Sequence, residues 1–258
     1  MEEETKELKK FITNNNISTD ERIYKYDEKQ ISTLRQTKPW RKDPNFFKDV
    51  KISATALIKM VNHAKMGAEM DPPVEVMGLM QGKFTEGSFI IFDSFALPIE
   101  GSETRVNAGS EADNFMIEWS EDLEKVGRKE LNVGWYHSHP GFGCWLSGID
   151  VNTQHNYQTM GYEPWLAVVI DPIRTISTGK VEIGAFRTFP KNYTRPEDKN
   201  VTFDMIPEEK LKDFGVHFKR YYTLDVSFFK SKLDDEIIQV LWNKYWMSTL
   251  SSSNLLLN

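Results

Sequence analysis

Residues 136–150, YHSHPGFGCWLSGID, contain two histidines spaced two apart, followed by a serine and an aspartate spaced three apart. If His137 and His139 lie on a strand, their side chains project to the same side, because strand residues i and i+2 share a face. Ser147 and Asp150 fit the capping box of a following helix, and a carboxylate in that first turn can reach back toward the histidines. The spacing therefore predicts that two imidazoles and one carboxylate converge on one point.

Two histidines and one carboxylate are a known ligand set for catalytic zinc, in which a water takes the fourth position. Zinc lowers the pKa of its water to about 7 and polarises a carbonyl as a Lewis acid. Two other interpretations of the segment stay open. Cys144 lies between the histidines and the aspartate and could act as a catalytic thiol. The whole segment could also be a strand, a turn and a capped helix with ordinary hydrogen-bonded histidines.

A metal site of this kind needs a group that moves protons, and Glu75 is the candidate. It interrupts the apolar run VEVMGLM at residues 74–80. A carboxylate buried there carries a desolvation cost unless a charge, a metal ion or water compensates it. The alternative is an ordinary glutamate that stays in water at the mouth of a strand.

The elements that must position these side chains alternate between helical and strand patterns. Apolar residues at helical spacing predict helices over residues 53–67, 111–130, 147–160 and 233–250. Short apolar runs bounded by turn residues predict strands over residues 74–82, 88–97, 132–139, 164–172, 180–189 and 216–229. Ser53 is the expected N-cap of the first of these helices. The interleaving predicts an α/β fold with one mixed sheet flanked by helices.

A chain of 258 residues fits one large domain with extensions. We expect an N-terminal arm over residues 1–50, in which a short charged helix leads to an extended strap through KPWRKDPNFF. The main domain is expected over residues 51–230 and a C-terminal helix over 231–258. The closing SSSNLLLN suggests a helical tail that has been cut.

Composition narrows the class of protein. The net charge is −6 with dispersed basic residues, which argues against a nucleic-acid binder. The chain has no run of about 18 apolar residues and no signal peptide, so we expect no membrane association and an intracellular location. A single cysteine excludes an internal disulfide and fits a reducing compartment.

Glu75, the triplet at 137–139 and the quartet at 147–150 resemble the JAMM motif of MPN-domain metalloproteases, Glu…His-Ser/Thr-His-x7-Ser-x2-Asp. Every defining position of that motif matches. The flanking sequence from about residue 38 onward resembles that of one branch of this family, the catalytic subunits of the COP signalosome. The segments that carry this second resemblance include KPWRKDP, EVMGLMQGK, DSFALPIEGSETRVNA and GWYHSHPGFGCWLSGID.

The resemblance implies a single MPN domain with one zinc ion, bound by His137, His139 and Asp150 and completed by a water. It implies that Glu75 is the general acid and base and that Ser147 stabilises the oxyanion. The implied activity is that of an isopeptidase, a deneddylase that removes the ubiquitin-like modifier NEDD from cullin lysines. The implied partners are other signalosome subunits, in particular an MPN-domain subunit, and neddylated cullin-RING ubiquitin ligases, in cytoplasm and nucleus.

Two other functions remain alternatives within the same family. A deubiquitinase of the proteasome-lid type would carry the same motif, and only the flanking sequence argues against it. A non-catalytic MPN scaffold is expected to lack ligands, whereas all of them are present here.

The loop EGSETRVNA carries a charged pair, Glu103 and Arg105. A solvated loop with a weak salt bridge is the ordinary interpretation. Our hypothesis is that this loop covers the cleft in the isolated chain and that Glu103 competes for the open zinc position until partners move it. Structural roles are expected for the other polar candidates, which are His63, His155, Asp171 and His217.

Overall fold

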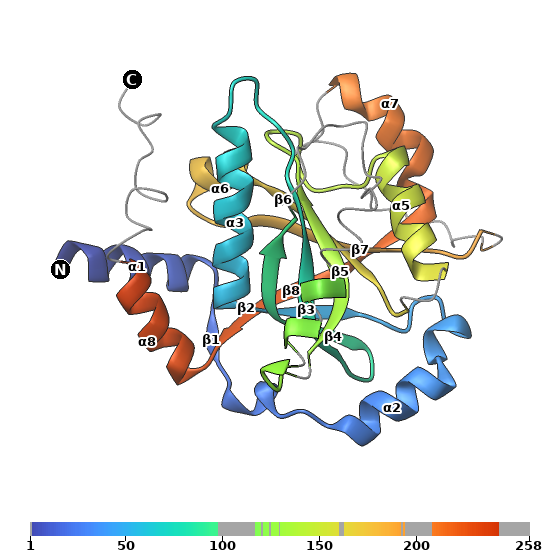
Figure 1. The fold of residues 1–258 in the computed structure, drawn as a ribbon. Helices are drawn as coiled ribbons and strands as arrows, with labels where there is room; N and C mark the ends of the chain where they lie inside the picture. The colour runs from blue at the N-terminus through green and yellow to red at the C-terminus, as the bar shows by residue number, and fades with distance from the viewer. Residues whose placement is uncertain are drawn as a thin grey trace.

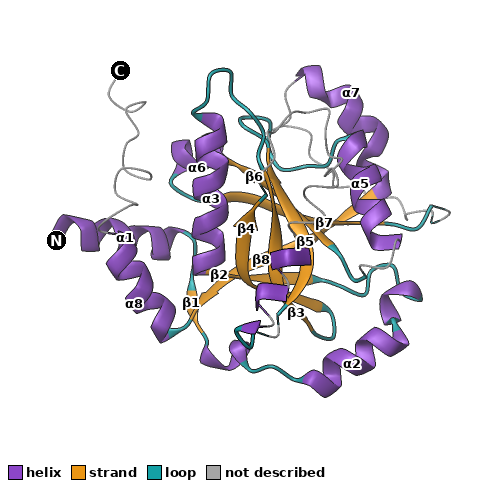
Figure 2. Ribbon diagram, viewed as in Figure 1, coloured by secondary structure: helices purple, strands orange, loops and turns teal. Residues whose placement is uncertain are grey.

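The computed structural model of the chain describes residues 2–97, 117–119, 121–123, 125–128, 130–159, 163–191, 193 and 208–242. In this part of the chain, one mixed sheet of eight strands lies between helices, with α3 and α6 on one side and α5 and α7 on the other (Figures 1 and 2). The predicted α/β class is therefore confirmed. None of the helices within the described ranges is long and apolar enough to span a bilayer.

The strands are β1 (Ser18–Thr19), β2 (Asp49–Ser53), β3 (Met77–Phe84), β4 (Ser88–Ala96), β5 (Leu131–Ser138), β6 (Leu166–Asp171), β7 (Glu182–Thr188) and β8 (Tyr221–Lys230). The α-helices are α1 (Glu2–Asn14), α2 (Glu28–Thr37), α3 (Ala54–Ala68), α5 (Gly148–Thr159), α6 (Pro172–Thr178), α7 (Glu208–His217) and α8 (Lys232–Leu241). Short 3-10 helices are η1 (Glu21–Tyr24), η2 (Pro39–Arg41) and η3 (Phe218–Arg220).

The sheet curls so far that it closes on itself. Its strand order is β1-β8-β2-β4-β3-β5-β6-β7, and β8 also pairs with β7. Residues 221–224 of β8 run antiparallel to β7, whereas residues 225–229 run parallel to β2. In this strand order β5 lies between β3 and β6, so both of its edges are hydrogen-bonded. The strand that carries the paired histidines is thus held on both sides.

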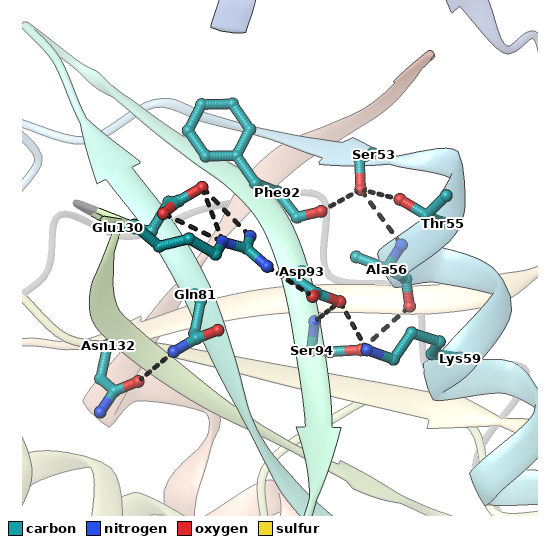
Figure 3. A network of polar contacts seen from close by, with 11 residues as sticks. Ser53, Thr55, Ala56, Lys59, Gln81, Phe92, Asp93, Ser94, Glu130 and Asn132 are labelled. Carbon is teal, nitrogen blue, oxygen red and sulfur yellow. Dashed lines mark hydrogen bonds and ion pairs between the residues drawn. The ribbon is translucent and has the colours of Figure 1, made fainter. Parts of the chain in front are cut away.

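Helix α3 confirms the predicted start after Ser53. The Ser53 hydroxyl accepts a hydrogen bond from the Ala56 amide at 3.1 Å and donates one to the Phe92 carbonyl at 2.7 Å (Figure 3). One side chain therefore caps the helix and ties it to β4. Close by, Asp93 accepts from Lys59 at 2.6 Å in a partly exposed ion pair, which contributes little stability by itself.

Several elements differ from the sequence-based expectation. Helices α2, α6 and α7 were not predicted, and η2 lies within the segment expected to be an extended strap. Part of the predicted arm belongs to the sheet, because β1 pairs with β8 and β2 begins at Asp49. In the helix expected over 111–130, residues 117–119 and 121–123 are helical, and 111–116 lie outside the described residues. The boundaries at residues 50 and 230 remain a proposal.

Among the described residues, the two larger of three apolar clusters lie on the two sides of the sheet. The larger one joins α3 to the sheet and contains Phe47, Met60 and Phe89, all fully buried. The second contains Trp135, Leu146, Val151 and Trp165 and lies beneath α5. This second core supports the segment that follows β5.

Close approach of β5 to β6 requires glycine at residue 134. A Cβ atom at Gly134 would lie 2.3 Å from the backbone oxygen of Leu166, its partner in the parallel ladder. We expect Gly134→Ala to lower the free energy of unfolding by about 1–3 kcal/mol, as overpacking typically does. Urea unfolding of this variant beside Gly215→Ala, where a Cβ meets nothing within 4 Å, provides the measurement. Equal unfolding midpoints for the two variants would contradict this account.

Candidate metal centre

The two histidines project from the end of β5 toward α5. His137 stacks on the Trp135 ring with centroids 4.6 Å apart, and the Trp135 indole N–H donates to Gln154 of α5 at 2.8 Å. His139 lies one residue beyond the strand, but its amide donates to the Ile170 carbonyl at 2.9 Å and so extends the ladder to β6. The alternation of side chains continues through residue 139, and both imidazoles lie on one face as predicted.

The turn after His139 is held by Asp171. The amides of Gly141 and Gly143 donate to the Asp171 carboxylate at 3.0 and 2.8 Å, and both glycines have φ above +80°. The turn brings the Gly143 carbonyl to 3.1 Å from Nδ1 of His139. Because a carbonyl only accepts, Nδ1 carries the hydrogen, and a neutral His139 presents the lone pair of Nε2. Asp171 therefore has a structural role, as expected for it.

Ser147 and Asp150 form the predicted capping box at the start of α5. The Ser147 amide donates to Asp150 Oδ2 at 2.8 Å, and the Asp150 amide donates to Ser147 Oγ at 3.2 Å. The same Oδ2 atom lies 3.4 Å from His137 Nε2 and 3.6 Å from His139 Nε2, while the two Nε2 atoms are 3.2 Å apart. The structure thus brings all three side chains together.

Burial and charge make this group a metal-binding candidate. His137, His139 and Asp150 are each 4% exposed, and their ligand atoms lie within 4.8 Å of one another. Burial by itself would raise the pKa of Asp150, but attraction and hydrogen bonding by His137, and then by His139, hold this pKa well below its ordinary value. The site is therefore an ionised carboxylate beside two imidazoles, a set that can hold a metal ion.

Glu75 lies two residues before the start of β3 and not within that strand. β3 begins at Met77, so the expected position of Glu75 on a strand was wrong. The segment still continues the pairing, because Ser138 donates to the Val76 carbonyl at 3.0 Å and Val76 donates to Ser138 Oγ at 2.9 Å. Continued by one residue, this antiparallel register places Glu75 opposite His139. Its half-buried side chain lines the same pocket as His139.

The pocket has a volume of about 480 Å³ and extends from the ligand group to helix α7. Glu75, Ser147 and Asp150 line the pocket, and Asp213 and His217 line the wall formed by α7. This wall was not predicted from the sequence, because no helix was expected over residues 208–217 and a structural role was expected for His217. The apolar pair Leu211 and Phe214, three residues apart, was the signal that could have indicated α7.

The other candidate residues from the sequence do not belong to the metal-ligand group. Burial raises the pKa of the Cys144 thiol, with further contributions from Glu182 and Asp171, so the thiol stays protonated. This weakens the thiol interpretation. The structure gives both remaining histidines partners away from the ligands, Thr188 Oγ1 at 3.4 Å for His155 and the Tyr136 hydroxyl at 2.9 Å for His63. Glu103 and Arg105 lie outside the described residues.

Comparison with known proteins agrees with this arrangement. Residues 45–163 match the family described as JAB1/Mov34/MPN/PAD-1 ubiquitin protease. The chain is 57% identical to the COP9 signalosome complex subunit 5 of Caenorhabditis elegans and 54% identical to that of Dictyostelium discoideum. These alignments cover 95% and 97% of this chain and 65% and 75% of the respective relatives. Subunit 5b of Arabidopsis thaliana is 56% identical over 93% of this chain and 66% of its own length.

The chain thus spans about two thirds to three quarters of the length of these relatives. The match to the Dictyostelium protein alone covers 253 residues, including the whole ligand group. The chain therefore belongs to the family of COP9 signalosome complex subunit 5 proteins and carries their JAB/MPN domain.

Proposed function

We propose that this chain is a zinc-dependent isopeptidase that removes the ubiquitin-like modifier NEDD from cullin lysines. The observation that carries the proposal is the buried group of His137, His139 and Asp150. Two of its members, His139 and Asp150, line the same pocket as Glu75 and Ser147. The relatives named as signalosome subunits support the choice of substrate.

The ligand group fits zinc in both chemistry and spacing. Zinc favours nitrogen and oxygen ligands at 2.0–2.2 Å, and two such ligands on a tetrahedron lie roughly 3.3–3.6 Å apart. The three observed separations are 3.2, 3.4 and 3.6 Å. Three protein ligands also leave a fourth position open, which distinguishes catalytic zinc sites from closed structural ones. When bound, zinc supplies Lewis acidity, which lowers the pKa of water to near 7 and polarises a carbonyl.

Glu75 is suited to move the proton in this reaction. Its carboxylate lies in the pocket beside His139 and can take a proton from the attacking water. The same carboxyl group can then donate the proton to the lysine amine that leaves, so one residue acts first as base and then as acid. A positioned acid/base of this kind contributes about two to four decades of rate.

Ser147 is suited to stabilise negative charge on the scissile carbonyl oxygen. Its Oγ accepts a hydrogen bond from the Asp150 amide at 3.2 Å, which uses a lone pair and leaves the hydroxyl hydrogen to donate. A donor that is already oriented needs no reorganisation when charge develops, and one such donor is typically worth about 3 kcal/mol.

A deubiquitinase is the second candidate, since the matched family is described by that activity. The metal ligands, Glu75 and Ser147 serve either modifier, so the choice depends on surfaces away from the metal. We also propose that the chain works within a signalosome, as the relatives' names indicate for those proteins. The other subunits and the neddylated cullin-RING ligases are then its partners.

We expect the chain to bind one zinc ion and to be stabilised by it. At a free zinc concentration 100-fold above the dissociation constant, the free energy of unfolding should rise by about 2.7 kcal/mol. His139→Ala should lose both the bound zinc and this stabilisation. His155→Ala is the matched control, because His155 lies on α5 away from the ligands. Elemental analysis and thermal unfolding measure the effects, and a full zinc equivalent in His139→Ala would rule out the assigned site.

Glu75→Gln should reduce cleavage of a neddylated cullin by about two to four decades while zinc content stays unchanged. The glutamine keeps the shape of the side chain but cannot take up the proton. Cys144→Ala should stay within about threefold of the original rate, because the buried thiol has no role in the proposed chemistry. The assay uses zinc-loaded protein assembled with the other subunits. Loss of cleavage in Cys144→Ala, or faster cleavage of a ubiquitin isopeptide than of neddylated cullin, would count against the proposal.

Autoinhibition by Glu103 is a separate part of the proposal. If this carboxylate competes for the open zinc position, Glu103→Ala should cleave a fluorogenic NEDD substrate faster than the unmodified chain when each is assayed alone. After assembly with partner subunits, the two rates should converge. Equal and slow cleavage by both isolated proteins would exclude the role.

A further inference from the structure

Helix α7 packs directly on the segment that links His139 to α5. Its buried residue Phe214 lies edge-on to Trp145 with ring centroids 6.0 Å apart, and Trp145 lies edge-on to His139 at 5.5 Å. Figure 1 shows α7 and α5 side by side, and the two helices are in contact. Helix α7 therefore packs both on Trp145, which contacts His139, and on α5, which follows Ser147.

The polar contact between α7 and α5 is made at Gly148. Asp213 Oδ2 accepts a hydrogen bond from the Gly148 amide at 3.3 Å, and Asp213 Oδ1 lies 3.4 Å from His217 Nε2. The His217 ring lies against the bare Cα of Gly148, since a Cβ there would come within 2.6 Å of Nε2. Asp213 and His217 therefore hold the residue that directly follows Ser147.

This position matters because Gly148 is the first residue of α5. The first amides of a helix have no partner within the helix, and negative charge is favourable there. The Asp150 amide is satisfied by Ser147 Oγ, whereas the Gly148 amide is satisfied by a carboxylate from another helix. The peptide unit that joins Ser147 to Gly148 is thus fixed from outside α5.

We propose that Asp213 is a positioning residue for the cleavage reaction: by holding the Gly148 amide, it fixes Ser147 Oγ where the oxyanion forms. This inference rests on the proposed function of Ser147. Among the described residues, the polar contacts of Asp213 are with Gly148 and His217 and not with the three metal ligands. We therefore expect Asp213 to act through Ser147 and not on the metal. Its loss should therefore lower kcat and leave KM and zinc content unchanged.

Three variants test the role in the assembled, zinc-loaded protein. Asp213→Ala should lower kcat about tenfold, within the range that misplacing a catalytic group costs. Asp213→Asn keeps an acceptor oxygen and should recover most of the rate. Glu208→Ala, an exposed position on the same helix, should match the original protein. A rise in KM with kcat unchanged would show that Asp213 binds substrate instead, and would overturn the inference.

The most specific test combines two substitutions. Ser147→Ala alone should lower kcat by about two to three decades, as removal of an oxyanion donor does. If Asp213 works through Ser147, adding Asp213→Ala to that background should change kcat less than about twofold, because groups that act as a unit are non-additive. Effects that multiply would overturn the inference.

Amide hydrogen exchange separates this inference from the proposed function. Exchange in a peptide covering residues 146–150 should be faster in Asp213→Ala than in Glu208→Ala. If the original protein cleaves no neddylated cullin but this difference appears, the contact stands and only the proposed function fails. Equal exchange in the two variants overturns the positioning role, whatever the activity.

Discussion

The structure depends on bringing two imidazoles and a carboxylate together away from water. The three side chains are each 4% exposed, and their closest atoms are 3.2–3.6 Å apart. Ring lone pairs and a carboxylate repel one another at such distances unless a cation or a proton lies among them. The backbone on each side must therefore resist separation of the ligands. The strands, turn and helix around the three side chains hold them in place against this repulsion.

The histidines and the carboxylate are held in place by different elements. On the histidine side, β5 is paired along both edges, and the Asp171 carboxylate fixes the turn that orients His139. On the carboxylate side, the capping box holds Asp150 in the first turn of α5, and the Trp135–Gln154 hydrogen bond ties α5 to the strand below. Side chains supported in this way are preorganised, which metal binding and catalysis both require.

Local patterns predicted that His137, His139 and Asp150 would lie together, as they do in the structure. The spacing of His137 and His139 and the capping box at residues 147–150 depend only on strand alternation and helix-cap chemistry, and both patterns appear in the structure. The Ser53 cap and the hairpin of β3 and β4 were predicted on the same basis. Glu75 was misplaced by two residues because strand ends are poorly marked in sequence, but its pairing neighbour Val76 still brings it to His139.

Features that depend on tertiary structure could not be predicted. Closure of the sheet requires β8 to change partners halfway along its length, and its sequence carries no signal for that change. The contact of helix α7 with Gly148 joins residues 65 positions apart. The role of Asp171 likewise depends on a hydrogen bond to Gly143, 28 positions away. These contacts follow from the fold and not from local pattern.

X-ray absorption at the zinc edge, recorded on zinc-loaded protein, identifies the atoms that bind the metal. We predict a four-coordinate ion with two imidazole nitrogens and two oxygens, one from Asp150 and one from water, at about 2.0–2.2 Å. The imidazole scattering should be lost when both histidines are replaced. A zinc–sulfur distance near 2.3 Å would place Cys144 on the metal, and a spectrum unaffected by those replacements would place the ion elsewhere. Either result would exclude His137, His139 and Asp150 as the metal ligands.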